Sequence, residues 1–249
     1  MLALHGAAWA ITWGDSEHTC PVCSTKNTFQ TPMSYGSYIY SYPSKYQMIY
    51  WPYTDRPTVY CCSKCRLSTY MYDFDSIPAA NIPALRTMLA DVKIAATDDY
   101  TEIPVSTRLE IAERVYTILG RDQDFWGHFY RVLGYHYHHE SLQEKADAAR
   151  RRALSIAESQ LTDTASLQPR KISYYIIGAM QHFLRNDEQA LASFDKTVST
   201  PYVDRESTAE ESGRAEEGIT KLTNEYIDLI RTGKYPRDHR KMGDADHHH

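Results

Sequence analysis

Two short Cys-x2-Cys motifs constrain the fold of this 249-residue chain more than any other feature of its sequence. They occupy Cys20–Cys23 and Cys62–Cys65. A turn of this spacing directs both of its thiolates toward one point, and two such turns supply the four soft ligands that tetrahedral zinc prefers. The motifs therefore predict a structural zinc site formed by Cys20, Cys23, Cys62 and Cys65.

The 38 residues between the two motifs exceed the 15 to 20 of the compact zinc-binding pattern. Because antiparallel strands can leave one motif and return beside the other, we expect a β-hairpin in this interval. Its many aromatic residues and interspersed prolines are typical of short strands and turns. The tyrosines of this run are Tyr35, Tyr38, Tyr40, Tyr42, Tyr46, Tyr50, Tyr53 and Tyr60.

Other roles for the cysteines stay open at this point. Two disulfides become possible if the chain is exported, and an iron-sulfur centre uses the same four thiolates. A redox pair is a further alternative, although no βαβ pattern surrounds either motif. Four cysteines fill a tetrahedral shell and leave no position for water, which disfavours catalytic zinc. We interpret Cys61 as spare and His18 as unnecessary to the ligand shell.

Beyond Pro83 the sequence is rich in Ala, Leu, Glu, Arg and Ile, and it predicts an all-α region. Ser106 is expected to cap the N-terminus of one helix, and Gly120 and Gly233 are expected at helix C-termini. The expected helices cover residues 83–96, 104–120, 123–138, 141–161, 170–184, 187–199 and 205–232.

Two parts of this helical region share one pattern of large and small residues. The register is that of a tetratricopeptide-like helical hairpin, in which a small residue lets the second helix approach the first. Arg150 stands where Phe is usual and Gln181 where Tyr is usual, so a generic helical bundle is the alternative. The matching residues are Tyr130, Leu133, Gly134, Tyr137, Ala146 and Ala153 in the first part, and Tyr174, Ile177, Gly178, Ala190, Phe194 and Pro201 in the second.

Together these patterns predict an α+β protein. We expect a β-rich, zinc-ribbon-like module at 15–75 and a tetratricopeptide-like helical array at 83–232, with tails at 1–14 and 233–249. The chain contains no stretch of about 20 apolar residues, so we expect no membrane span. Its formal charge of -5 disfavours non-specific nucleic-acid binding, which relies on clustered Lys and Arg.

The two ends of the chain leave the cellular compartment open. Met1–Ala10 is small and apolar, and Ala8-Trp9-Ala10 has the form that signal peptidases cleave. The segment is either an ordinary apolar one in a cytoplasmic protein or the end of an export signal. His247–His249, a tag remnant or a natural tail, are left out of the site.

The same residues resemble a known family. The segments that carry the resemblance are Cys20-Pro-Val-Cys23 with Phe29, Tyr35-Gly-Ser-Tyr38, Pro43-Ser-Lys-Tyr46, Trp51-Pro-Tyr-Thr-Asp55, Cys62-x2-Cys65-x2-Ser68 and Leu133-Gly-Tyr-His136. The chain resembles bacterial domain-of-unknown-function family 2225 over most of its length. The resemblance implies a zinc-ribbon-type module joined to tetratricopeptide-like helices, with Cys20, Cys23, Cys62 and Cys65 as metal ligands. It implies no activity.

For function, the sequence favours a non-enzymatic adaptor whose helical array binds a protein or peptide. Tyr50, Trp51 and Tyr53 are candidate contact residues because amphipathic aromatic rings are common at binding hot spots. Base stacking by the same aromatic module on a nucleic acid is one alternative, with Lys26, Lys45, Arg56, Lys64 and Arg66 on the phosphates.

An enzyme of unrecognised class is the other alternative. No Gly-rich phosphate loop, Gly-x-Ser-x-Gly elbow or His-Glu-x2-His motif is present. Asp73 and Asp75 could be paired carboxylates on one side of a strand. We interpret His136, His138 and His139 as packing or exposed residues, because only the first and third share a helix face.

Overall fold

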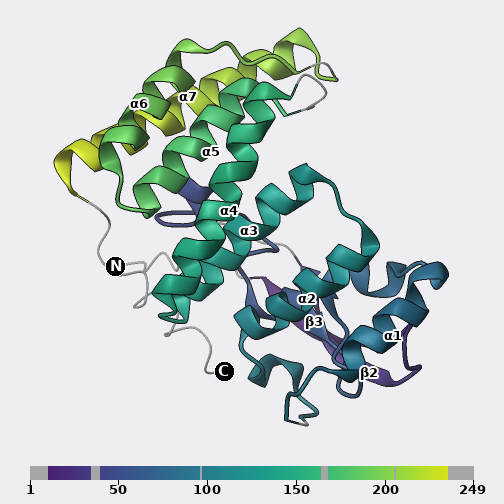
Figure 1. Cartoon of the computed structure of the whole chain (residues 1–249). Helices are drawn as coiled ribbons and strands as arrows, with labels where there is room; N and C mark the ends of the chain where they lie inside the picture. The colour runs from purple at the N-terminus through teal and green to yellow at the C-terminus, as the bar shows by residue number, and fades with distance from the viewer. Residues whose placement is uncertain (1–10, 35–39, 96, 164–167, 205, 235–249) are drawn as a thin grey trace, which may run out of the picture. The chain divides into compact units, whose positions relative to one another are not determined.

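The computed structural model describes residues 11–34, 40–95, 97–163, 168–204 and 206–234. They form two compact units (Figure 1). Unit 1 contains the described residues of Met1–Ile39 and Trp51–Arg121, and unit 2 contains those of Tyr40–Tyr50 and Asp122–His249. The architecture is α+β, with hairpins near the N-terminus followed by a helical array, as the sequence predicts. Met1–Ala10, Tyr35, Tyr38 and His247–His249 lie outside the described residues.

Unit 1 contains two antiparallel β-hairpins. Strand β1 (Thr12–Thr19) pairs with β2 (Lys26–Ser34), and β3 (Val59–Cys61) pairs with β4 (Ser68–Tyr70). Each hairpin turns at one Cys-x2-Cys motif. The expectation of a hairpin running between the motifs is therefore wrong for the described residues, in which 40–58 contain turns and 3-10 helices but no strand.

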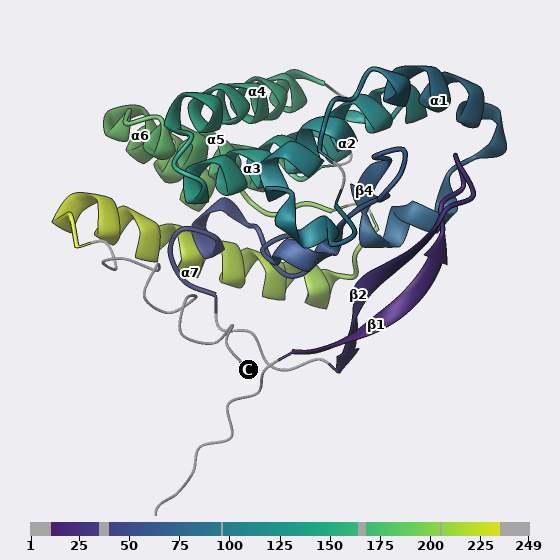
Figure 2. The ribbon, with the colours of Figure 1, turned by 90° about the horizontal axis from the view of Figure 1, so that it is seen from below.

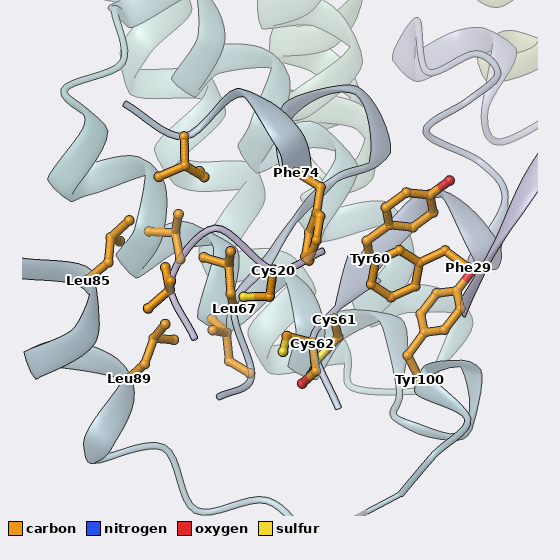
Figure 3. Packing of buried hydrophobic residues seen from close by; sticks show 14 of the residues in the cluster. Cys20, Phe29, Tyr60, Cys61, Cys62, Leu67, Phe74, Leu85, Leu89 and Tyr100 are labelled. Carbon is orange, nitrogen blue, oxygen red and sulfur yellow. Dashed lines mark hydrogen bonds between the residues drawn. The ribbon is translucent and has the colours of Figure 1, made fainter. Parts of the chain in front are cut away.

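Two helices complete the core of unit 1. They are α1 (Ile82–Ala90) and α2 (Val105–Leu119). Leu85 from α1 is fully buried with Phe29, Leu67 and Phe74 of the hairpin region (Figure 3). Val115 from α2 is fully buried in the same core. Two short hairpins bury too little apolar surface to be stable alone.

The compact units therefore do not follow the expected division into 15–75 and 83–232. The change in composition near residue 75 marks approximately where the helices begin. It does not mark where one hydrophobic core ends and the next begins, because α1 and α2 pack against the hairpins.

The helix ends match the sequence in part. Gly120 and Gly233 follow α2 and α7 in the left-handed conformation, at φ of 69° and 63°, as expected for C-terminal glycines. The expected cap at Ser106 is wrong. Pro104 occupies the N-cap of α2, and Ser106 is a buried residue inside the helix. Proline suits this boundary because it lacks the N–H that a helix start leaves unpaired.

Unit 2 is an array of five helices in the described residues. They are α3 (Gln123–His139), α4 (Gln143–Thr162), α5 (Arg170–Phe183), α6 (Asp187–Ser199) and α7 (Ala209–Thr232). Each packs on the next in chain order. A capping box of Thr208 and Glu211 starts α7. No helix in the described part of the chain has the length and apolar character to cross a membrane.

Glycines set the spacing inside two helix pairs. A Cβ atom at Gly134 of α3 would lie 3.2 Å from Cγ of Arg150 on α4. A Cβ atom at Gly178 of α5 would lie 2.6 Å from Cε1 of Phe194 on α6. Both positions are those at which the sequence pattern required a small residue. At position 178 any larger residue would require the Phe194 ring to move, whereas the contact at position 134 is less tight.

Residues Tyr40–Tyr50, which we call the strap, belong to unit 2 although they precede α3 by 72 residues in the sequence. The strap contains one short 3-10 helix, Lys45–Gln47. It lies alongside α3, α5 and α7, and is drawn in dark blue in Figures 1 and 2. Part of the tyrosine-rich run expected in the β module therefore forms part of the helical core.

Candidate metal centre

The two cysteine motifs adopt the same backbone conformation at the tips of their hairpins. In the first, the N–H of Cys20 donates to the carbonyl of Thr25 at 2.8 Å, and Ser24 N–H donates to the carbonyl of Cys20 at 2.8 Å. In the second, Cys62 N–H donates to the carbonyl of Leu67 at 2.9 Å, and Arg66 N–H donates to the carbonyl of Cys62 at 3.1 Å. The offsets along the chain are identical.

A left-handed residue closes each turn directly after the second cysteine. Ser24 has φ of 59° and Arg66 has φ of 65°. Residues with a side chain rarely adopt this conformation, and its repetition in both turns indicates a shared geometric requirement. The turn reverses the chain while keeping both thiols of a motif on one side. This is the local reason that the sequence presents two sulfur atoms from each hairpin.

The four sulfur atoms meet in one cluster. Sγ of Cys20 lies 3.5 Å from Sγ of Cys65, and Sγ of Cys23 lies 3.6 Å from Sγ of Cys62. All four lie within 4.8 Å of one another. A tetrahedron of sulfurs at the usual zinc–sulfur distance of about 2.3 Å has edges of about 3.8 Å, so the donor set and its spacing fit such an ion. The cluster could therefore hold a metal ion.

Contacts that involve no metal hold the two turns together. The side-chain oxygen of Asn27, on β2, accepts from Ser63 N–H at 2.8 Å, and its amide donates to the carbonyl of Thr25 at 2.9 Å. Arg86 of α1 donates to the carbonyl of Val22 at 2.9 Å. These bonds position the carbonyls and amides around the sulfurs, as outer-shell groups do in metal sites.

The thiols influence each other's ionisation because they are close and partly buried. Hydrogen bonding with Cys62 raises the pKa of Cys20 to about 12. Hydrogen bonds from Cys20 and Cys65 lower the pKa of Cys62, and the backbone amides of Lys64 and Cys65 add to this effect. Hydrogen bonding with Cys20 and Cys62 raises the pKa of Cys65. Of these three thiols Cys62 is therefore the most readily ionised, and a cation in the cluster would favour ionisation of the others.

The neighbouring candidates lie outside the cluster. All five cysteines are free thiols, and Cys61 is buried with its pKa raised by burial. His18 contacts Asp75 through Nδ1 at 2.7 Å and Ser16 through Nε2 at 2.6 Å. Neither residue belongs to the group whose ligand atoms converge.

Asp73 and Asp75 do not form a carboxylate pair on a strand. They lie in a 3-10 helix, Met71–Ser76, so the strand expected there is wrong. Asp73 accepts a hydrogen bond from Tyr116 at 2.7 Å and pairs with Arg121 at 2.8 Å, whereas Asp75 contacts His18. The two carboxylates are therefore committed to different partners.

The candidate aromatic contact residues pack within the protein. The ring of Tyr50, at the end of the strap, lies 4.8 Å from that of Tyr40. Trp51 packs against the core of unit 1, and the Tyr53 ring lies 4.8 Å from that of Tyr70. Tyr50 is 38% exposed and the other two are half-buried.

The three histidines near the end of α3 do not converge on one point among the described residues. His136 is buried, whereas His138 and His139 are exposed. Nδ1 of His138 contacts the side chain of Gln143, and the ring of His139 lies 4.3 Å from Tyr135. Within the described residues, the four cysteines form the one group of metal-type ligands that converge.

Comparisons of the chain with protein-family models, with curated proteins and with solved structures gave no match.

Sequence reasoning missed the strap entirely. Its signal was present, because Pro43 and Ser44 lie between Tyr42 and Tyr46 in a segment whose residues do not alternate as those of a half-buried strand do. The sequence marks Arg150 only as a departure from the tetratricopeptide pattern, in which Phe is usual at this position.

Proposed function

We propose that this chain is a non-enzymatic adaptor in which zinc fixes the hairpin unit and the helical array binds a peptide segment of a partner protein. The hairpin unit corresponds in this proposal to a zinc ribbon, and the α3–α4 and α5–α6 pairs to tetratricopeptide-like hairpins. The resemblance to family 2225 is part of the same proposal.

Zinc is the metal that best suits four thiolates held by two rigid turns. It would be bound by Cys20, Cys23, Cys62 and Cys65 and would supply structural cross-linking of the two hairpins. Four protein ligands leave no position for substrate, which supports a structural role. Nothing in this unit requires the ion to take part in chemistry.

The strap supports peptide binding, because it is a non-α-helical segment of the chain that the helical array holds by defined contacts. The carbonyl of Tyr46 accepts from the hydroxyl of Tyr175 on α5 at 3.1 Å. The carbonyl of Gln47 accepts from Nη1 of Arg131 on α3 at 2.8 Å. Hydrogen bonds to backbone carbonyls do not depend on the identity of the side chain, so they suit a peptide-binding surface.

Aromatic contacts add the side-chain part of this recognition. The ring of Tyr42 stacks on Phe183 of α5, with centroids 5.5 Å apart, and the ring of Tyr46 lies 4.6 Å from Tyr226 of α7. Nζ of Lys45 pairs with Glu225 at 2.6 Å. Rings in pockets with polar contacts beside them are the usual anchors of a protein interface. We call the surface of α3, α5 and α7 that contacts the strap the strap groove.

The metal part is tested on full-length protein purified without chelator. Elemental analysis should find one zinc per chain, and titration with a mercurial reagent should release that zinc as the reagent bonds to the four thiolates. Cys61→Ser is the matched control: it should keep one zinc, whereas Cys62→Ser should lose it. A chain with no zinc, with iron, or with two disulfides contradicts the proposal.

The peptide part is tested with the double variant Tyr42→Ala/Tyr46→Ala of the full chain, which removes the aromatic anchors of the strap and leaves the groove intact. A fluorescein-labelled synthetic peptide with the sequence of residues 40–50 should bind this variant and raise its fluorescence anisotropy. Tyr72→Ala, an exposed position of unit 1, is the control and should bind no better than wild type. A folded double variant that ignores the peptide contradicts peptide binding by the groove.

A further inference from the structure

One arginine of the helical unit is buried and incompletely paired. Arg150 of α4 is 1% exposed, and its Nη1 lies 3.6 Å from Oδ1 of Asp147, beyond ordinary hydrogen-bond length. The Asp147 carboxylate is already engaged by Arg185 and by Gln143. Nε and Nη2 of Arg150 have no hydrogen-bond partner among the described residues. A buried charged donor without an acceptor is costly and unusual.

The unpaired edge of Arg150 has a definite chemical preference. Nε and Nη2 carry the two parallel N–H donors on one side of the guanidinium, and this pair matches the two oxygens of a carboxylate. No carboxylate of the described residues occupies it. The stem of the side chain reaches this place because position 134 is a glycine, whose missing side chain leaves room for Cγ of Arg150.

The location of this edge connects it with the strap groove. The guanidinium carbon of Arg150 lies 4.8 Å from the centre of the Phe183 ring. Tyr42 of the strap stacks on the same ring. Tyr42 and Tyr226, both of which take part in the strap contacts, are also close enough to Arg150 to influence its pKa electrostatically. A ligand side chain that replaced Tyr42 would therefore enter the neighbourhood of the unpaired donors.

The strap has an advantage that an outside peptide must overcome. It is part of the same chain, so its effective concentration at the groove is on the order of millimolar. A competing peptide with the same contacts and no more would not displace it at ordinary concentrations. It needs an interaction that the strap lacks, and a charge-assisted bidentate pair is among the strongest available.

Building on the proposed function, we propose that the partner is an acidic peptide whose carboxylate takes the place of Tyr42, pairs with Nε and Nη2 of Arg150, and displaces the strap from the groove. The aromatic and carbonyl contacts of Tyr46 and Gln47 would be reproduced by the partner. Arg150 is then the specificity-determining residue of the site, and the strap sets the affinity that a partner must exceed.

The test compares two labelled peptides on the full-length Tyr42→Ala/Tyr46→Ala variant. One has the sequence of residues 40–50, and the other differs from it by glutamate in place of Tyr42. The glutamate peptide should bind about ten-fold more tightly, because the bidentate pair should outweigh the loss of the Tyr42 ring contact. The preference should vanish when Arg150→Gln is added, and Arg150→Lys should recover only part of it.

Arg185→Gln is the matched control, since it removes a nearby positive charge that is largely exposed and also contacts Asp147. It should leave the glutamate preference in place. Equal binding of the two peptides, or a preference that survives Arg150→Gln, overturns the assignment of Arg150 but leaves peptide binding standing. Failure of both peptides to bind a folded variant refutes the groove itself, and with it the peptide part of the proposed function.

A second measurement avoids variants that fail to fold. In the wild-type chain, the amides of Gln47 and Ile49 are hydrogen-bonded within the strap and should exchange slowly with solvent deuterium. Saturating glutamate peptide should accelerate their exchange by displacing the strap, whereas the residue 40–50 peptide at the same concentration should have a smaller effect. Unchanged exchange with the glutamate peptide overturns displacement.

Discussion

Replacing Gly178 by alanine tests whether α5 and α6 pack as closely as described. Alanine favours a helix over glycine by about 1 kcal/mol, so the substitution gains that amount if the site is open. At position 178, however, the new Cβ atom would meet three ring atoms of Phe194 at 2.6 to 3.0 Å. Overpacking of this kind costs about 1 to 3 kcal/mol. The net change should therefore lie between no effect and a destabilisation of about 2 kcal/mol.

Gly213→Ala supplies the matched control. Gly213 lies within a helix, is exposed, and has nothing within 4 Å of an added Cβ atom. This variant should be stabilised by about 1 kcal/mol. Urea unfolding followed by circular dichroism at 222 nm should separate the two variants by about 1 to 3 kcal/mol, because their helix propensity gains cancel. If Gly178→Ala stabilises the protein as much as Gly213→Ala, Phe194 does not pack against the glycine and the reasoning fails.

Three further outcomes are expected. Lys171 is fully buried and donates to the carbonyls of Thr197 and Thr200 at 2.9 Å. Because Lys171→Met leaves both carbonyls unpaired, it should lower the free energy of unfolding in urea titrations by about 2 kcal/mol. An unchanged free energy would contradict these hydrogen bonds. Burial lowers the pKa of His128 to about 3, so as the pH falls below about 6.5 this histidine binds a proton in the unfolded chain and not in the folded one. Its contribution to the free energy of unfolding is fully present above that pH, and about 2 kcal/mol should be lost between pH 7 and pH 5. His128→Gln should show a correspondingly flatter pH profile of the melting temperature, and an unchanged slope would contradict this account. Removal of the metal by a chelator, or Cys62→Ser, should abolish only the helical signal of α1 and α2, nine and fifteen residues long, while complete loss of ellipticity would contradict independent cores.

The helices could be predicted from the sequence because their cause is local. Helix-favouring residues, apolar spacing and terminal glycines predicted where each of the five helices of unit 2 starts and ends, to within a few residues. The glycines at 134 and 178 were located by pattern because close approach of two helices leaves few choices of residue. The cysteine cluster was equally accessible, since the spacing within each motif determines where its thiolates can point.

The placement of the strap and of α1 and α2 could not be predicted in this way. Composition reports what a segment tends to form, whereas membership of a core depends on contacts between residues far apart in the chain. Tyr46 meets Tyr175 across a separation of 129 positions, and Lys45 meets Glu225 across 180. No local pattern records such a pairing. For that reason we expected the whole aromatic run in the β-rich module that surrounds it in the sequence.

The discontinuity of unit 2 affects how the protein is completed during synthesis. The strap leaves the ribosome long before α7, which carries Glu225 and Tyr226, so its groove does not exist while the hairpin unit is already complete. For most of translation these tyrosines have no place to be buried, and they are available to other proteins that recognise exposed aromatic segments. A gene fragment beginning at residue 122 would encode the helices without the rings that fill their groove, and its product should be prone to self-association. Joining residues 40–50 to such a fragment through a flexible linker should reduce that self-association.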